Sequence, residues 1–130
     1  MRSRLIELAF AALLCCAAAT APAQVQVPEI RILVQSSPLA GYQYHAGSDV
    51  WRELKVGDRL DLKREPDNPH DARAVRVEWR GRQLGYLPRA ENQAVAAEMD
   101  RGGRVEARIA RLREHPNPWQ RVLVEVFVVL

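Results

Sequence analysis

Residues 64–88, with the sequence REPDNPHDARAVRVEWRGRQLGYLP, contain a loop followed by two predicted strands. Regular structure is excluded from residues 65–71, because Pro66 and Pro69 lack an amide donor and restrict the residue before each of them. Apolar and charged residues alternate over residues 74–79, which is typical of a strand with one buried face. Arg80 and Gly81 then predict a tight turn into a second strand over residues 83–87.

The same reasoning extends outward along the chain. In the strand 74–79 we expect Val75, Val77 and Trp79 to face the core. Alternation predicts further strands over residues 30–35, 60–64, 104–112 and 119–130. In the first strand the expected core residues are Ile30, Ile32 and Val34. In the strand 104–112 they are Val105, Ala107 and Ile109.

The remaining segments complete the expected fold. Residues 24–29 are a flexible lead-in, residues 39–44 are extended, residues 45–49 form a loop, and residues 50–54 form a strand or a helical turn. One helix is expected over residues 89–100, begun by Pro88 and stopped by Gly102 and Gly103. The sequence therefore predicts one mainly β (α+β) domain over residues 30–130. Its expected form is a small, partly closed β-barrel of the OB or SH3 type, with about six strands and one main helix.

The end of the last strand has no polar face. Residues 127–130 read FVVL, which indicates either burial on both sides or an exposed, adhesive edge. The second alternative predicts an interaction module whose C-terminal strand pairs with a strand of a partner protein.

The first 23 residues are typical of a signal peptide. Arg2 and Arg4 precede an apolar run that is too short to span a bilayer, and residues 21–23 read APA, a pattern that signal peptidase accepts. We expect cleavage after Ala23, a periplasmic or secreted protein, and no membrane anchor after cleavage. The alternative is lipidation at Cys16. The two cysteines of the chain, Cys15 and Cys16, both precede the expected cleavage site.

Composition gives few signs of catalysis. The chain has 130 residues, enough for one domain, and its formal net charge of +3 neither requires nor excludes nucleic acid. No nucleophile motif or phosphate-binding glycine loop is present, and the three histidines lack a metal-ligand spacing. We therefore expect a protein that is not an enzyme and has neither cofactor nor metal. The alternative is a loosely held divalent ion at His70, Asp67 and Asp71.

The order of short motifs resembles the HIRAN domain. The motifs are the loop Asn68-Pro69-His70-Asp71, the strand that begins Ala74-Val75, and the strand end Gly85-Tyr86-Leu87. The likeness extends from about residue 30 to residue 104. HIRAN domains occur at the front of some DNA-remodelling helicases and also alone in bacterial proteins. The resemblance implies that this chain folds as an OB-type barrel. It further implies that the chain binds nucleic acid, in particular the 3′ end of single-stranded DNA; another acidic polymer is the alternative ligand.

The resemblance also implies the binding residues, which are Tyr44, Asn68, His70, Asp71, Tyr86 and Arg89. The aromatic rings would stack on bases, Asp71 would accept a hydrogen bond from the terminal 3′-hydroxyl, and Arg89 would hold a phosphate. Two positions depart from the helicase pattern: His70 replaces a tyrosine, and Gln43 replaces a basic residue.

Each of these residues also has an alternative interpretation in which it only supports the fold. Tyr44 and Tyr86 would then belong to the core of the barrel. Asn68 and Asp71 would stiffen the loop, and Arg89 would be a solvated helix residue. A basic patch around Arg64, Arg89 and Tyr44 would favour nucleic-acid binding, whereas an unpaired C-terminal strand would favour a protein partner.

Overall fold

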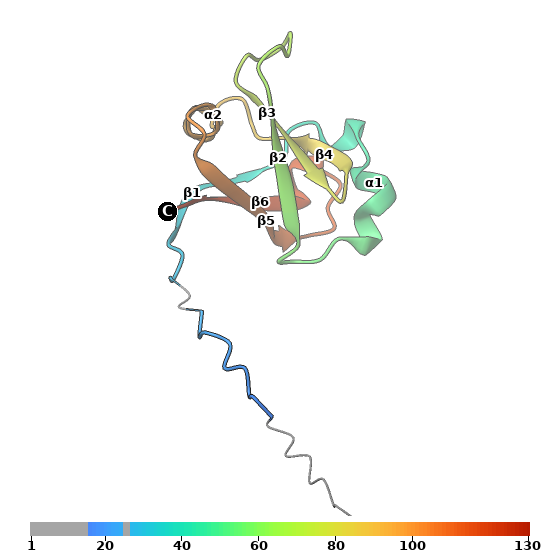
Figure 1. The fold of residues 1–130 in the computed structure, drawn as a ribbon. Helices are drawn as coiled ribbons and strands as arrows, with labels where there is room; N and C mark the ends of the chain where they lie inside the picture. The colour runs from blue at the N-terminus through green and yellow to red at the C-terminus, as the bar shows by residue number, and fades with distance from the viewer. Residues whose placement is uncertain (1–15, 25–26) are drawn as a thin grey trace, which may run out of the picture.

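The computed structural model describes residues 16–24 and 27–130. Its strands, in chain order, are β1 (Arg31–Pro38), β2 (Arg59–Glu65), β3 (Ala74–Trp79), β4 (Arg82–Tyr86), β5 (Arg104–Leu112) and β6 (Val122–Val129) (Figure 1). Its helical segments are η1 (Tyr42–Tyr44), α1 (Gly47–Val50), η2 (Trp51–Glu53), α2 (Gln93–Asp100) and η3 (Pro118–Gln120). Most of the expected signal peptide, including Arg2, Arg4 and Cys15, lies outside the described residues, and residues 16–24 are exposed and irregular.

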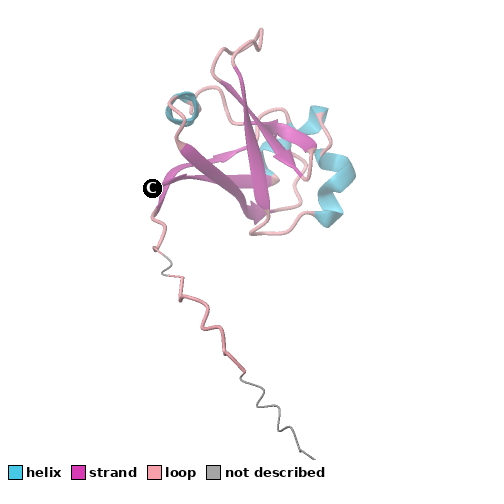
Figure 2. Cartoon of the chain, viewed as in Figure 1, coloured by secondary structure: helices cyan, strands magenta, loops and turns pink. Residues whose placement is uncertain are grey.

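The six strands form one antiparallel sheet in the order β1-β6-β5-β2-β3-β4. The sheet curls so that its two edge strands approach each other without pairing along their length (Figure 2). One bridge joins them: Ala40, just after β1, and Tyr86, at the end of β4, exchange backbone hydrogen bonds of 2.8 and 2.9 Å. The prediction of a mainly β, OB-like fold with about six strands is confirmed, with a sheet that stays open apart from this bridge.

The core fills the inside of the curled sheet. Val75, Val77 and Trp79 point inward from β3, as the alternation predicts, and Ala107 and Ile109 do so from β5. The other strands and helices add the remaining buried apolar residues, which are Leu39, Tyr42, Val50, Leu54, Leu60, Leu84, Leu87, Val95, Ala96, Val122, Val124 and Val126. Burying a side chain such as Val or Leu stabilises the fold by about 1.5 to 3 kcal/mol, so this cluster is the main source of stability.

The prediction for the inner face of the first strand was wrong. Ile30, Ile32 and Val34 are exposed, whereas Gln35 and Ser37 are buried and joined by a 3.0 Å hydrogen bond. Ile30 precedes β1, and Ile32 lies near its exposed start. An irregularity between Leu33 and Gln35 shifts the register of β1 against β6, so that Gln35 and Ser37, opposite Val126 and Val124, take the inward positions beyond it. Such a shift changes which side chains face inward, and alternation in the sequence cannot reveal it.

Four segments are more helical, or shorter, than predicted. Residues 42–44 form a 3₁₀ turn rather than an extended segment, and residues 47–53 are helical, which also resolves the open alternative for residues 50–54. Helix α2 begins at Gln93, four residues after the predicted start, because residues 88–91 form a separate turn in which the Glu91 amide bonds the Pro88 carbonyl (2.9 Å). The last strand begins at Val122, after the turn η3.

Of the two alternatives for the C-terminal strand, the structure excludes the exposed edge. Strand β6 pairs with β1 on one side and with β5 on the other, over most of its length. Its apolar tail is therefore covered by neighbouring strands, and β6 offers no free edge to a partner strand.

The solvent-facing side of β3 carries a buried acid. Alternation places Glu78 on the exposed face with Arg76, yet only 2% of Glu78 is exposed. Lys63 on β2 and Arg76 cover its carboxylate, at 2.8 and 2.7 Å. A buried carboxylate needs such partners, because an unpaired buried charge is strongly destabilising.

This acid is expected to make stability depend on pH. Hydrogen bonds from the charged groups of Lys63 and, to a smaller extent, Arg76 hold the pKa of Glu78 below its usual value, although burial alone would raise it. The resulting stabilisation is present at pH values above the unfolded pKa of about 4.3 and is lost as the pH falls through the folded pKa. In urea unfolding the wild type is expected to exceed Glu78→Gln in stability near neutral pH, by a margin that shrinks toward about pH 3. A margin that does not change with pH would contradict this.

Candidate functional site

A cleft of about 510 Å³ opens between the segment after β1, the loop between β2 and β3, and the end of β4. Its lining residues are Ala40, Gly41, Tyr44, His45, Asn68, His70, Asp71, Ala74, Tyr86, Leu87 and Arg89. The structure thus brings together all six residues that the sequence resemblance singles out, although they come from segments far apart in the chain. Their role in binding stays a prediction.

The loop between β2 and β3 is held by its own side chains. The Oδ1 atom of Asn68 accepts hydrogen bonds from the backbone amides of His70 (2.9 Å) and Asp71 (3.3 Å). Short polar side chains stiffen turns in this way, and here the Asn68 oxygen satisfies two backbone amides of a loop that its prolines keep out of regular structure. Asn68 therefore stiffens the loop and also lines the cleft, so both interpretations of this residue hold structurally.

Arg64 anchors the base of this loop and does not form part of a basic patch. Its guanidinium binds the carboxylate of Asp100 at 2.8 and 3.2 Å, and donates to the carbonyls of Ala74 (2.8 Å) and Ala72 (3.1 Å). With these donors engaged inside the protein, Arg64 ties the loop to the end of α2. The patch expected around Arg64, Arg89 and Tyr44 is not built as predicted.

Asp71 is a carboxylate held by two donors. Its Oδ1 accepts from the backbone amide of Arg73 (2.9 Å), and its Oδ2 accepts from Nδ2 of Asn92 (2.7 Å). Partial burial pushes the pKa of Asp71 upward, but these hydrogen bonds outweigh burial, and the pKa lies below its usual value. The nearby positive charges of Arg73 and Arg89 act in the same direction. Asp71 is therefore ionised at neutral pH and faces the cleft as an acceptor.

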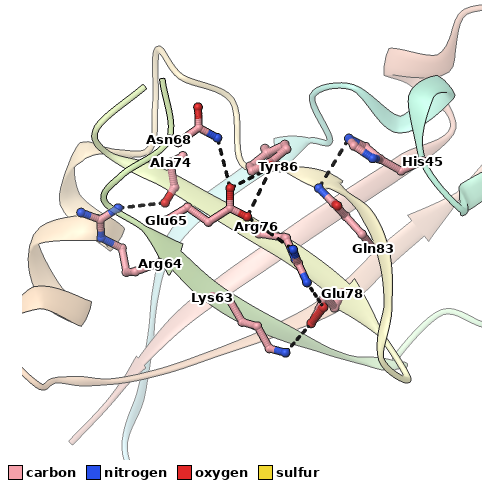
Figure 3. A network of polar contacts seen from close by, with 10 residues as sticks. All are labelled: His45, Lys63, Arg64, Glu65, Asn68, Ala74, Arg76, Glu78, Gln83 and Tyr86. Carbon is pink, nitrogen blue, oxygen red and sulfur yellow. Dashed lines mark hydrogen bonds and ion pairs between the residues drawn. The ribbon is translucent and has the colours of Figure 1, made fainter. Parts of the chain in front are cut away.

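The aromatic side chains stand at the cleft in different ways. Tyr44 is 80% exposed, which excludes the core interpretation for this residue. Tyr86 is half-buried; its ring lies edge-on to His45, with centroids 5.8 Å apart, and its hydroxyl donates to Glu65 at 2.9 Å (Figure 3). Burial raises the pKa of Tyr86, so its hydroxyl keeps the proton that it donates.

Two arginines lie near Asp71: Arg89, which lines the cleft, and Arg73, which is outside the lining. Arg89 is exposed and lines the cleft from the turn at residues 88–91. The prediction that Arg89 lies at the start of a helix was wrong, because α2 begins only at Gln93. Arg73 is exposed as well and makes a 3.3 Å bond to the side chain of Gln93. Gln43, at the position of the missing basic residue, is exposed and outside the lining of the cleft.

Sequence reasoning missed three residues that shape the site: His45, Glu65 and Asn92. Asn92 is fully buried and joins the loop to the start of α2, because its Nδ2 donates to Asp71 and to the carbonyl of Arg73 (2.9 Å). In the sequence Asn92 falls within the helix predicted over residues 89–100, so no signal marked it as part of the site. His45 adjoins Tyr44 in the chain, and Glu65 ends a strand; no local pattern marks either as part of a site.

Comparison with a family model decides the relationship. The model of the HIRAN domain matches residues 32–130, which is most of the chain. The chain belongs to the HIRAN domain family. HIRAN domains are generally DNA-binding modules and are not catalytic on their own, so a nucleic-acid partner is consistent with the family.

Two solved structures share this fold. A crystal structure of a protein from Lactobacillus plantarum matches with a TM-score of 0.67 and 24% identity, over 78% of this chain and 98% of that one. The HIRAN domain of human HLTF matches with a TM-score of 0.57 and 24% identity, over 75% of this chain and 78% of that one. At this identity the likeness concerns the fold alone. Among curated proteins, the comparison finds no match.

Two further observations concern residues 16–24 and 27–130. No group of three or more His, Cys, Asp or Glu side chains in this part of the chain is arranged to hold a metal ion, so His70, Asp67 and Asp71 do not form the alternative ion site. None of the helices described here has the length and apolar character needed to cross a membrane.

Proposed function

We propose that the cleft binds the 3′ end of single-stranded DNA and that the domain performs no catalysis. The observation that carries this proposal is that one cleft combines an exposed aromatic ring (Tyr44), an ionised carboxylate (Asp71) and an exposed guanidinium (Arg89). These are the groups that recognise a base, a terminal hydroxyl and a phosphate, respectively.

Asp71 has room for about two more hydrogen bonds, one at each carboxylate oxygen. Each carboxylate oxygen accepts about two hydrogen bonds, and each oxygen of Asp71 accepts one within the protein. A 3′-hydroxyl supplies a further donor, whereas a 3′-phosphate brings negative charge against an ionised carboxylate. The site therefore selects a free 3′-hydroxyl end, and Arg73 and Arg89 beside Asp71 neutralise the phosphates that precede it.

Fluorescence anisotropy of a short single strand labelled at its 5′ end tests the function. The strand with a 3′-hydroxyl is expected to bind more tightly than the same strand with a 3′-phosphate, and both are expected to weaken as salt increases. Absence of binding even at low salt would overturn the proposal. An unlabelled acidic polypeptide as competitor distinguishes DNA from another acidic polymer, because it carries the charge but neither bases nor a 3′-hydroxyl.

Replacing Tyr44 with alanine is expected to weaken binding of the strand by a factor between about five and about 150, since stacking of one base on an aromatic ring contributes about 1 to 3 kcal/mol. Because Tyr44 is exposed, its removal should change the free energy of unfolding by less than about 0.5 kcal/mol. Trp119→Ala, an exposed aromatic outside the cleft, is the matched control and should bind normally. Equal effects of both substitutions would show that general surface stacking, not the cleft, holds the strand.

We also propose that the chain is exported and cleaved after Ala23. The support is the charged, apolar and small-residue pattern of its first 23 residues. Intact-mass measurement of protein recovered from outside the cytoplasm should give a chain that begins at Gln24. A mass that includes the first 23 residues would contradict export by this route, and an added lipid mass on a chain beginning at Cys16 would support the alternative.

A further inference from the structure

Glu65, at the end of β2, touches two walls of the cleft without lining it. Its carboxylate accepts a hydrogen bond from the hydroxyl of Tyr86, at 2.9 Å to Oε1 and 3.3 Å to Oε2. Its Oε1 also accepts from Nδ2 of Asn68 at 3.1 Å (Figure 3). One carboxylate therefore joins the strand that carries Tyr86 to the loop that carries Asp71.

The position of Glu65 is itself fixed by a row of alternating charges. Lys63 pairs with Glu78 at 2.8 Å, Glu78 pairs with Arg76 at 2.7 Å, and Arg76 faces Glu65 at 3.6 Å. The strand registers place these groups on one face, since Lys63 lies opposite Arg76 and Arg76 lies opposite Tyr86. The row runs from Lys63 through the buried Glu78 and Arg76 to Glu65, whose partner Tyr86 lines the cleft, so it links the framework of the sheet to the site (Figure 3).

We propose that Glu65 is a positioning residue for the ligand site: it holds the ring of Tyr86 and the loop of Asn68 in the arrangement that receives the DNA end. This inference rests on the proposed function. The side chain of Asn68 connects Glu65 to the tip of the loop, because its Nδ2 donates to Glu65 while its Oδ1 holds the amides of His70 and Asp71. Loss of the Glu65 acceptor frees the Asn68 side chain, and those two amides lose a fixed partner.

Positioning and simple electrostatics predict opposite results. If Glu65 acted only as a negative charge near DNA, removing that charge would tighten binding in both Glu65→Ala and Glu65→Gln. If it acts by position, alanine weakens binding, because both acceptor bonds are lost. Glutamine keeps an Oε1 that accepts from Tyr86 and Asn68, so it is expected to restore most of the affinity.

The binding experiment uses oligothymidine with a free 3′-hydroxyl, labelled at its 5′ end. Glu65→Ala is expected to weaken binding about tenfold, and Glu65→Gln by no more than about twofold. In a Tyr86→Phe background the Glu65→Ala effect should shrink, because part of it acts through the missing hydroxyl. Glu125→Ala, which removes an acid paired with Arg108 elsewhere on the sheet, should bind like the wild type. Tighter or unchanged binding by Glu65→Ala would overturn the inference.

Amide hydrogen exchange without DNA tests the same inference independently. In Glu65→Ala the amides of His70 and Asp71 are expected to exchange about tenfold faster, while Glu65→Gln protects them nearly as the wild type does. Core amides such as those of Val75 and Val77 should be unchanged in both variants, which shows that the fold is intact. Unchanged exchange at His70 and Asp71 in Glu65→Ala would overturn positioning. A wild type that binds no DNA would overturn the proposed function instead, and the exchange result would still decide the role of Glu65.

Discussion

Asp71→Ala is expected to abolish the preference for a free 3′-hydroxyl end and to weaken binding of that strand about thirtyfold. A hydrogen bond to a charged acceptor contributes about 1.5 to 3 kcal/mol, and each 1.4 kcal/mol is a factor of about ten in affinity. The strand with a 3′-phosphate should lose little or even gain, because the repulsive carboxylate is gone. The measurement is anisotropy with the two strands side by side for wild type and variant.

The substitution also removes two contacts inside the protein, so a second variant is needed. The Asp71 carboxylate accepts from the Arg73 amide and from Asn92. Asp71→Asn keeps the acceptor for the Arg73 amide but loses the charge and the acceptor for Asn92. It is expected to lose the repulsion toward the 3′-phosphate while one of the two internal contacts is kept. Binding by Asp71→Ala that still favours the 3′-hydroxyl as strongly as wild type would rule out Asp71 as the acceptor.

The central hairpin could be predicted from the sequence because its determinants are local. The turn between β3 and β4 needs positive φ at its two central residues, and Arg80 and Gly81 have φ values of 46° and 78°. That turn fixes the hairpin, and the alternation then fixes which residues of β3 face the core. The loop residues Asn68, His70 and Asp71 were found for the same reason, since they lie within four consecutive positions of one motif.

What the sequence could not predict depends on contacts between distant residues. The inward face of β1 is set by a register irregularity against β6, almost a hundred residues later in the chain. Asn92 contacts Asp71 across 21 positions, and Glu65 contacts Tyr86 across the same separation. Neither contact produces a periodic pattern in the amino-acid sequence. These two residues, which hold parts of the cleft together, were therefore missed, whereas the six predicted residues do line the cleft.

Helix α2 shows how a correct signal can give a wrong boundary. Pro88 suits a helix start, and Gly102 and Gly103 stop the helix where predicted. The turn at residues 88–91 takes the proline instead, and the helix begins after Asn92. The buried side chain of Asn92 is bonded to Asp71 and to the carbonyl of Arg73 in the loop, and this position lies directly before the first residue of α2.

Gly85→Ala is expected to destabilise the fold by about 3 kcal/mol, the upper part of the usual range for forcing atoms into a packed site. A Cβ atom at Gly85 would lie 2.5 Å from the carbonyl oxygen of Ala40. That oxygen accepts the 2.9 Å hydrogen bond from the Tyr86 amide, which is half of the bridge that joins the two edges of the sheet. The chain can relieve the clash only by moving these backbones apart, so the bridge is lost.

The same substitution should therefore weaken DNA binding, because the bridge also sets the width of the cleft. Ala40 lines one wall of the cleft and Tyr86 the other, and they meet at this point. Urea unfolding measures the stability, and anisotropy in the absence of urea measures the affinity.

Gly57→Ala is the matched control: its φ is also positive, at 90°, but a Cβ there meets no atom within 4 Å. It should cost only about 1 to 2 kcal/mol from backbone strain and leave affinity unchanged. If Gly85→Ala lost no more stability than Gly57→Ala and bound DNA normally, the bridge would hold neither the sheet nor the cleft.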